Sequence, residues 1–134
     1  MKNKFITLAA LSGLFTVAFG AIASHALSAQ LVEPKALGWI DTGIKYQMFH
    51  TLAIFALGLF QIANASQNSP ACRAKAFNII GDSWALGILL FSGNLYLLAL
   101  GIPTIHWLTP IGGLSFMLGW VVLIYISVRR RNVQ

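Results

Sequence analysis

Long apolar stretches alternate with short polar connections along most of this chain. Four stretches are long enough to cross a bilayer as helices, and they occupy residues 5–24, 46–65, 77–101 and 107–128. Roughly 20 helical residues, at a rise of about 1.5 Å each, cross a hydrocarbon core about 30 Å thick. The pattern therefore predicts an all-α membrane protein that forms a four-helix transmembrane bundle.

The longest connection, the external loop of residues 25–45, has a pattern of its own. Pro34 suits the start of a helix, and apolar residues then recur at helical spacing up to Ile44, with Trp39 as an interfacial anchor. We expect a short amphipathic helix over about residues 34–45, lying on the outer surface and either ending before the second span or running into it.

Composition leaves little room for anything but the spans. The chain has 134 residues, of which 57% are hydrophobic and 9% are charged. Residues 1–134 are therefore expected to form a single transmembrane domain. The connection around Pro103 is only a few residues long, so the third and fourth helices should be antiparallel neighbours.

Positive charge gathers on alternate connections. Only Lys35 and Lys45 lie on one side, and the basic residues of the other side are Lys2, Lys4, Arg73, Lys75, Arg129, Arg130 and Arg131. The positive-inside rule then predicts a membrane protein with both termini in the cytoplasm. The net charge of +6 would also suit a nucleic-acid-binding protein, but these charges lie in tight groups beside apolar segments. We assign them to topology and to contact with the lipid bilayer, and expect no nucleic-acid partner.

The first apolar stretch has a second interpretation. Lys2 and Lys4, followed by an apolar run that ends at Ala21-Ile22-Ala23, resemble a signal peptide with a cleavage site. The run of about 20 residues exceeds the roughly 7–15 residues of a signal peptide's apolar region. We therefore expect a retained first helix, although the sequence alone does not decide whether it is ever cleaved.

Small and hydroxylic residues recur along the apolar stretches. Such residues let membrane helices approach closely, because association in lipid relies on packing and hydrogen bonds. We therefore predict helix contacts at Ser12, Gly13, Thr16, Gly20, Gly93, Gly112, Gly113 and Gly119.

Polar residues inside the spans are the best guide to a site, because they are costly in a bilayer unless they are paired. Most of them fall in the predicted outer half, and our candidate polar pocket consists of His25, Tyr46, Gln47, His50, Ser92, Tyr96 and Thr109. Gln47 shares a helix face with Thr51, which makes a plausible stripe facing the bundle. Asn94 lies about 200° around the helix from Ser92, so the two cannot line one pocket.

Three interpretations of this pocket compete. His25 and His50 could bind a metal or haem iron, but no histidine pair has tight ligand spacing on one helix. The pocket could instead bind a small molecule, lipid or ion from outside. The third interpretation is hydrogen bonding between helices that fixes the bundle. We expect the third, and predict no cofactor and no metal site.

The chain offers little for catalysis. It lacks G-x-S-x-G, H-E-x-x-H and Walker motifs, and its acidic residues are only Glu33, Asp41 and Asp82. Asp82 should lie one turn into the third helix, within reach of Arg73 or Lys75. The lone Cys72 excludes an internal disulfide. We predict no catalytic residues and no enzymatic activity.

Several blocks of the sequence are similar to one family. They are Gly20 through His25-Ala26-Leu27, Trp39, Tyr46-Gln47-Met48-Phe49-His50, Leu89-Leu90-Phe91-Ser92-Gly93 with Tyr96, Thr109-Pro110-Ile111-Gly112-Gly113, and Gly119-Trp120. In order and spacing they resemble domain of unknown function 423, small uncharacterised inner-membrane proteins related to the transmembrane protein 256 family. Ala23-Ser24-His25 departs from the Gly-Ala-His common in that family, and Asn94 stands where Ser is commoner.

The resemblance implies a four-helix inner-membrane protein and brings no established activity with it. It draws attention to the same candidate polar pocket, since those residues fall inside the matching blocks. We expect a non-enzymatic accessory or assembly protein, whose partner is another membrane protein or a second copy of this chain. The alternative is binding or transport of a small molecule, lipid or ion in an outward-facing pocket around His50.

Overall fold

The computed structural model describes residues 3–27, 35–65 and 71–131, without the side chains of 26–27, 71–73 and 130–131. Lys2, Glu33 and Pro34 lie outside the described residues, as do the side chains of Cys72, Arg73, Arg130 and Arg131. The predictions made for those residues are not taken further.

All regular secondary structure in the described residues is helical. Helix α1 (Lys4–Ile22) continues into the π-helical turn η1 (Ala23–Leu27), and α2 covers Ala36–Ala63. Helix α3 (Ala71–Gly87), the π-helical turn η2 (Ile88–Ser92) and α4 (Gly93–Ala99) follow one another without a break, and α5 covers Leu108–Arg131. Four helical segments are long and apolar enough to cross a membrane: Lys4–His25, Ala36–Ala63, Ala74–Ala99 and Leu108–Arg129. The prediction of an all-α protein with four spans is confirmed.

Two boundaries differ from the prediction. Helix α2 begins at Ala36 and not at Tyr46, so residues 36–45 are its first turns and the expected helix of this segment runs into the second span, one of the two alternatives. Ala36 and Ile40 are buried in an apolar cluster with Ala23 and Ala99, which directs this face into the bundle. Helix α3 begins at Ala71 instead of Phe77, so Asp82 lies three turns into the helix instead of one.

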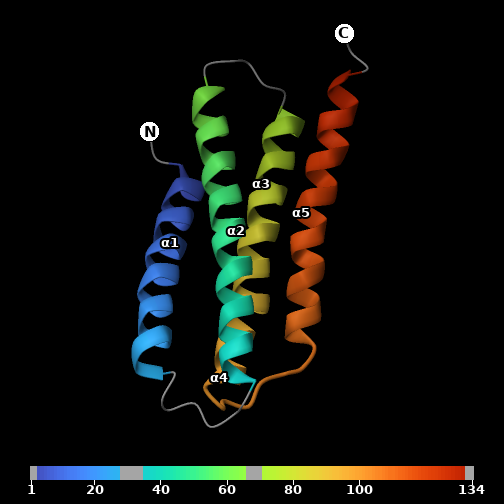
Figure 1. Ribbon diagram of the computed structural model, residues 1–134. Helices are drawn as coiled ribbons and strands as arrows, with labels where there is room; N and C mark the ends of the chain where they lie inside the picture. Colours follow the sequence, from blue (N-terminus) through green and yellow to red (C-terminus); the bar gives the residue numbers. More distant parts are fainter. Residues whose placement is uncertain (1–2, 28–34, 66–70, 132–134) are drawn as a thin grey trace.

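The helices stand side by side in the order α1, α2, α3, α5, and α4 continues α3 (Figure 1). Helix α1 begins and α5 ends at the same end of the bundle, which we call the terminus end; the opposite end is the distal end. Helix α1 packs on α2, whereas α5 packs chiefly on α3 and η2. Between α2 and α5 the contacts described are made by aromatic side chains, such as the His50 ring on Phe116.

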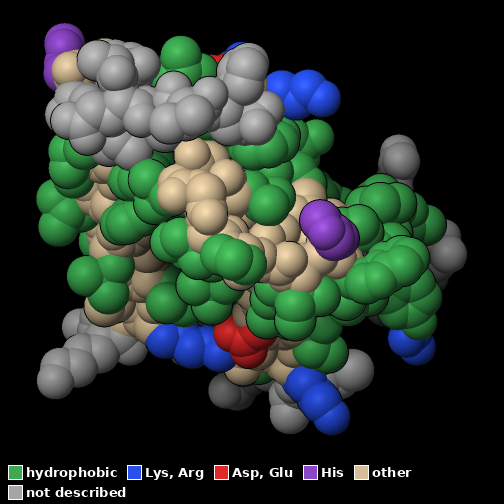
Figure 2. Space-filling model, turned by 90° about the horizontal axis from the view of Figure 1, so that it is seen from below, with side chains coloured by type: hydrophobic (Ala, Val, Ile, Leu, Met, Phe, Trp, Pro, Cys, Tyr) green, Lys and Arg blue, Asp and Glu red, His purple; other side chains and the backbone are tan. Residues whose placement is uncertain are grey.

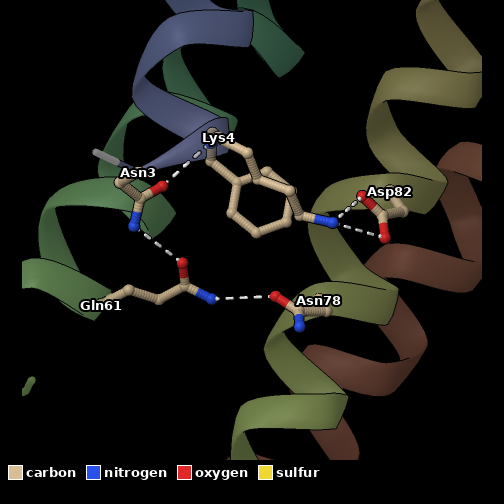
Figure 3. A network of polar contacts seen from close by, with 6 residues as sticks. Asn3, Lys4, Gln61, Asn78 and Asp82 are labelled. Atoms are coloured by element: carbon tan, nitrogen blue, oxygen red, sulfur yellow. Dashed lines mark hydrogen bonds and ion pairs between the residues drawn. The ribbon is translucent and has the colours of Figure 1, made fainter.

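A polar clamp holds the start of α1 to α2 and α3 at the terminus end (Figure 3). The Asn3 side chain caps α1 by accepting from the Phe5 N–H at 2.9 Å, and its amide donates to Gln61 Oε1 at 3.0 Å. Lys4 Nζ donates to both Asp82 carboxylate oxygens, at 2.8 and 2.9 Å. Asp82, expected within reach of Arg73 or Lys75, is thus paired with Lys4, because the earlier start of α3 places Asp82 level with the start of α1.

Two small residues of α5 let it lie directly against η2 and α3. A Cβ built on Gly112 would collide with the Phe91 backbone nitrogen and the Leu90 carbonyl carbon. One built on Gly119 would collide with the Trp84 indole. Ser115, between them, donates a hydrogen bond to the Ser83 carbonyl at 2.7 Å, so one face of α5 is fixed along its length.

The other small residues differ in how close their neighbours lie. Gly13 and Gly20 face α2 at ordinary van der Waals distance, since an added Cβ would lie 3.8 Å from Thr51 Cγ2 and 3.6 Å from Ile44 Cδ1. Gly93 has only a carbonyl of its own helical segment near it, at 4.0 Å.

Replacement of Gly112 by alanine should destabilise the bundle by about 1–3 kcal/mol, because the methyl group meets backbone that cannot move aside. Gly113→Ala is the matched control, since its Cβ would lie 3.9 Å from Phe91 Cδ2 and alanine favours the helix. Unfolding of both variants in mixed detergent micelles, followed by circular dichroism, measures the difference. Equal stability of the two variants would contradict the close approach of α5 to η2.

Candidate functional site

Five polar side chains from three helices form a hydrogen-bonded group in the middle of the bundle. We call them the polar network: Ser12, Thr16, Gln47, Thr51 and Tyr96. The Ser12 and Thr51 hydroxyls lie 2.6 Å apart, and the Gln47 amide donates to Ser12 Oγ at 3.1 Å. The Tyr96 hydroxyl donates to Gln47 Oε1 at 2.8 Å. The network thus joins α1, α2 and α4 through groups that have no water to bind in a bilayer.

Helical spacing explains how these residues meet. Gln47 and Thr51 lie one turn apart on α2, and both are buried, as the predicted stripe requires. Ser12 and Thr16 have the same spacing on α1, and the Thr16 hydroxyl donates to the Ser12 carbonyl at 2.8 Å. The Ser12 carbonyl also accepts from Gln47 Nε2 at 3.3 Å, so Gln47 binds both the backbone and the side chain of α1.

His50 lies on the neighbouring face of α2 and is 3% exposed. Its Nδ1 is 2.9 Å from the Tyr46 carbonyl, which can only accept, so Nδ1 carries the proton. Its Nε2 accepts a hydrogen bond from the Trp120 indole N–H at 3.2 Å. Both ring nitrogens therefore have partners, and these partners assign the neutral Nδ1–H tautomer.

Aromatic rings surround this imidazole and connect α2 to α3 and α5. His50 stacks on Phe116 with ring centroids 3.7 Å apart and an interplanar angle of 12°. Phe49 meets it edge-on at 5.2 Å, and Trp84 and Trp120 lie 4.7 Å from each other on its other side. We call His50 and these four rings the His50 cluster. Their contacts pack α2 against α5.

The three histidines do not come together. His25 and His106 are exposed, and Figure 2, which looks onto the distal end, shows histidine side chains well apart there. Among the residues that the structure describes, no group of three His, Cys, Asp or Glu side chains could hold a metal ion. A metal at His50 would have to displace Trp120 from Nε2, the one ring nitrogen with a lone pair.

The remaining candidates of α4 and α5 point to different neighbours. The Asn94 amide donates to Thr109 Oγ1 of α5 at 2.7 Å, whereas Tyr96 points to α2. Ser92 is fully buried, and its hydroxyl has no hydrogen-bond partner within the described parts of the chain. Asn94 was expected to point away from Ser92 and Tyr96. In the structure, Asn94 contacts α5 and Tyr96 contacts α2.

Two grooves run between α2 and α5, on either side of His50 and Trp120. The distal groove has a volume of about 720 Å³ and is walled by aromatic and apolar side chains, with Lys45 at one end. The terminus-end groove has a volume of about 1000 Å³ and includes Lys75 and Arg129. Of the candidate polar pocket, only Tyr46 and His50 line the distal groove, because Gln47, Tyr96 and Thr109 bond within the bundle.

Sequence reasoning did not find the partners of His50. Trp84 and Trp120 lie near the middle of their spans, whereas tryptophan usually anchors a span at the membrane interface. The Trp120 indole N–H donates to His50, whereas the Trp84 indole N–H has no acceptor among the described residues. The two unusual positions could have indicated a buried site.

Comparison with known proteins gives a consistent result. The family model described as protein of unknown function (DUF423) matches residues 19–113. A Haemophilus influenzae protein named "UPF0382 membrane protein" is 48% identical over 99% of this chain and all of its own length. The Escherichia coli K12 "UPF0382 inner membrane protein YgdD" is 38% identical over 98% of this chain and 95% of its own. The Bacillus subtilis "UPF0382 membrane protein YwdK" is 31% identical over 93% and 96%. No solved structure matches significantly.

Removal of the Tyr96 hydroxyl should cost about 1 kcal/mol of stability, because Gln47 Oε1 loses its donor in a water-free interior. We expect Tyr96→Phe and Gln47→Leu to be non-additive in a double-mutant cycle of unfolding in mixed micelles. Tyr46→Phe is the control, since that residue is 46% exposed and its hydroxyl bonds to none of the described residues. Additive losses would show that the two side chains do not interact.

Proposed function

The chain belongs to the DUF423 family of membrane proteins of unknown function, and we propose that it is a non-enzymatic accessory protein that binds a helix of another membrane protein. The partner helix would lie in the distal groove. Membership of an uncharacterised family does not identify an activity, so the proposal depends on the geometry of this chain.

One observation carries the proposal: several of the candidate polar side chains bind partners within the bundle, and the grooves are lined mainly by apolar side chains. Gln47 and Tyr96 bond to each other, His50 bonds to Trp120, and Asn94 bonds to Thr109. Groups committed in this way hold helices together and are not free to bind or activate a substrate. This supports a structural task for the polar residues and leaves binding to the apolar surfaces.

The wall of the distal groove suits a helix. Gly113 has only Phe91 near it, 3.9 Å from the position of an added Cβ, and Pro110 and Leu114 lie on the same wall. Small residues facing lipid let a second helix approach the backbone closely. Phe49 and Trp120 provide the large apolar contacts that interfaces favour.

We further propose that the terminus end faces the cytoplasm of a bacterium. Lys4, Lys75 and Arg129 lie at that end, whereas Lys35 and Lys45 lie at the distal end. The excess of positive charge at the terminus end supports this orientation. The name of the Escherichia coli relative, an inner membrane protein, supports the choice of membrane.

The distal groove also favours a second candidate function, binding of an apolar small molecule. Its volume of about 720 Å³ lies within the usual range of ligand pockets, about 300–1,000 Å³, and His50 contributes to its wall. The two candidates can be distinguished by the mass of the molecule in the distal groove, which is a protein for the first and a small molecule for the second.

A photoreactive amino acid at Met117 tests the two candidates in native membranes. Met117 lines the distal groove and is 62% exposed; Leu14, 70% exposed on α1, lines neither groove and is the control position. We expect irradiation to join a discrete second protein to position 117 and not to position 14. An adduct of low mass at 117 alone would favour the small molecule. Adducts to lipid alone at both positions, or turnover by the pure monomer, would refute the accessory role.

Thiol labelling in intact cells tests the orientation. In a Cys72→Ser background, Gly38→Cys places a thiol at the exposed distal start of α2, and Ala65→Cys places one at the terminus end. A membrane-impermeant maleimide should label position 38 in intact cells with a permeabilised outer membrane. Position 65 should react only after lysis. The reverse pattern would overturn the proposed orientation.

A further inference from the structure

The terminus-end groove has an apolar end near the middle of the bundle and a basic end. Helices α2, α3 and α5 form its walls, with Leu57, Phe77 and Leu123 among the apolar side chains. Trp84 and Trp120 lie at the mid-bundle end, where the His50 cluster separates this groove from the distal one. Its volume of about 1000 Å³ is at the upper end of the range for ligand pockets.

The two basic residues of the groove lie at the same distance from its tryptophan end along their two helices. On α3, Trp84 lies nine positions after Lys75, and on α5 Arg129 lies nine positions after Trp120. At about 1.5 Å per residue, each interval covers about 13 Å along the helix. One leaflet contributes about half of a 30 Å hydrocarbon core, so the groove reaches from the middle of the bilayer to the level of the headgroups.

The two cations at that level lack carboxylate partners. Among the described residues, Asp82 pairs with Lys4 and Asp41 with Lys45, and neither Lys75 nor Arg129 forms an ion pair. The Arg129 guanidinium donates to the Tyr125 hydroxyl at 3.0 Å, which positions it at the groove without neutralising its charge. The groove therefore offers an apolar channel with two uncompensated positive charges at the headgroup level.

We propose that this groove binds one anionic phospholipid of the adjacent leaflet. An acyl chain would lie along the apolar wall toward Trp84 and Trp120, and the phosphate would lie between Lys75 and Arg129. Basic pockets between transmembrane helices bind anionic headgroups by this combination of charge and depth. The inference is independent of the partner proposed for the distal groove.

Charge argues against a second copy of the chain as the occupant. The terminus end of another copy carries the same unpaired Lys75 and Arg129, so pairing of two such ends would bring like charges together. A phosphate brings the opposite charge and needs no further residue of the protein. A lipid is therefore the better match for this end of the groove.

Native mass spectrometry of the full chain in mild detergent tests the proposal. Phosphatidylglycerol and phosphatidylcholine with identical acyl chains are titrated separately. We expect one phosphatidylglycerol to bind at least tenfold more tightly than phosphatidylcholine. The double variant Lys75→Gln/Arg129→Gln should lose about tenfold or more of the phosphatidylglycerol affinity. Lys35→Gln/Lys45→Gln removes the same charge at the other end and should leave the affinity unchanged.

A second variant tests the apolar part without changing charge. Ala56 is exposed and lines the groove, so Ala56→Phe should fill the space of the acyl chain and weaken binding of both lipids. Equal affinity for the two lipids, binding unchanged in Ala56→Phe, or a lipid-free dimer would each overturn the proposal. If the charge variant does not fold, the lipid selectivity of the unmodified chain and the effect of Ala56→Phe still decide the question.

Discussion

Hydrogen-bonding groups in the interior of a bilayer must find partners within the protein, and the arrangement of α1, α2 and α4 depends on this constraint. Gln47 satisfies this constraint with three hydrogen bonds. Its amide nitrogen donates to the backbone and side chain of Ser12, and its oxygen accepts from Tyr96. A shift of either neighbouring helix along its axis would leave at least one of these groups unpaired. The network therefore fixes both which helices are neighbours and their relative height.

Helix α5 is held by different forces. Close backbone approach at Gly112 and Gly119 and the bond from Ser115 to Ser83 fix it on η2 and α3. Toward α2 it contributes the Phe116 and Trp120 rings, and the bond between Trp120 and His50 is a polar contact there. The bundle is therefore closely packed along one face of α5 and loosely bridged along the other, and both grooves are found on the loosely bridged face.

Much of the fold could be predicted from the sequence, because the length of an apolar run and the thickness of a bilayer determine the spans directly. The shared face of Gln47 and Thr51 followed equally from helical periodicity. The burial of Ala36 and Ile40 at the start of α2 could not be predicted, since it comes from Ala23 and Ala99, which lie far away in sequence. The pairing of His50 with Trp120 joins residues 70 positions apart, and no local pattern encodes it.

The π-helical turn η2 has a consequence for the register of the third span. A π-helical turn accommodates one residue more than an α-helical turn, and each residue of an α-helix corresponds to a rotation of about 100°. If Ile88–Ser92 became regular α-helix with all its residues kept, α4 would rotate by about that angle relative to α3. The Tyr96 hydroxyl would then turn away from Gln47, and Asn94 from Thr109. The π-helical geometry of this turn, independently of its side chains, thus specifies which neighbour each polar residue of α4 meets.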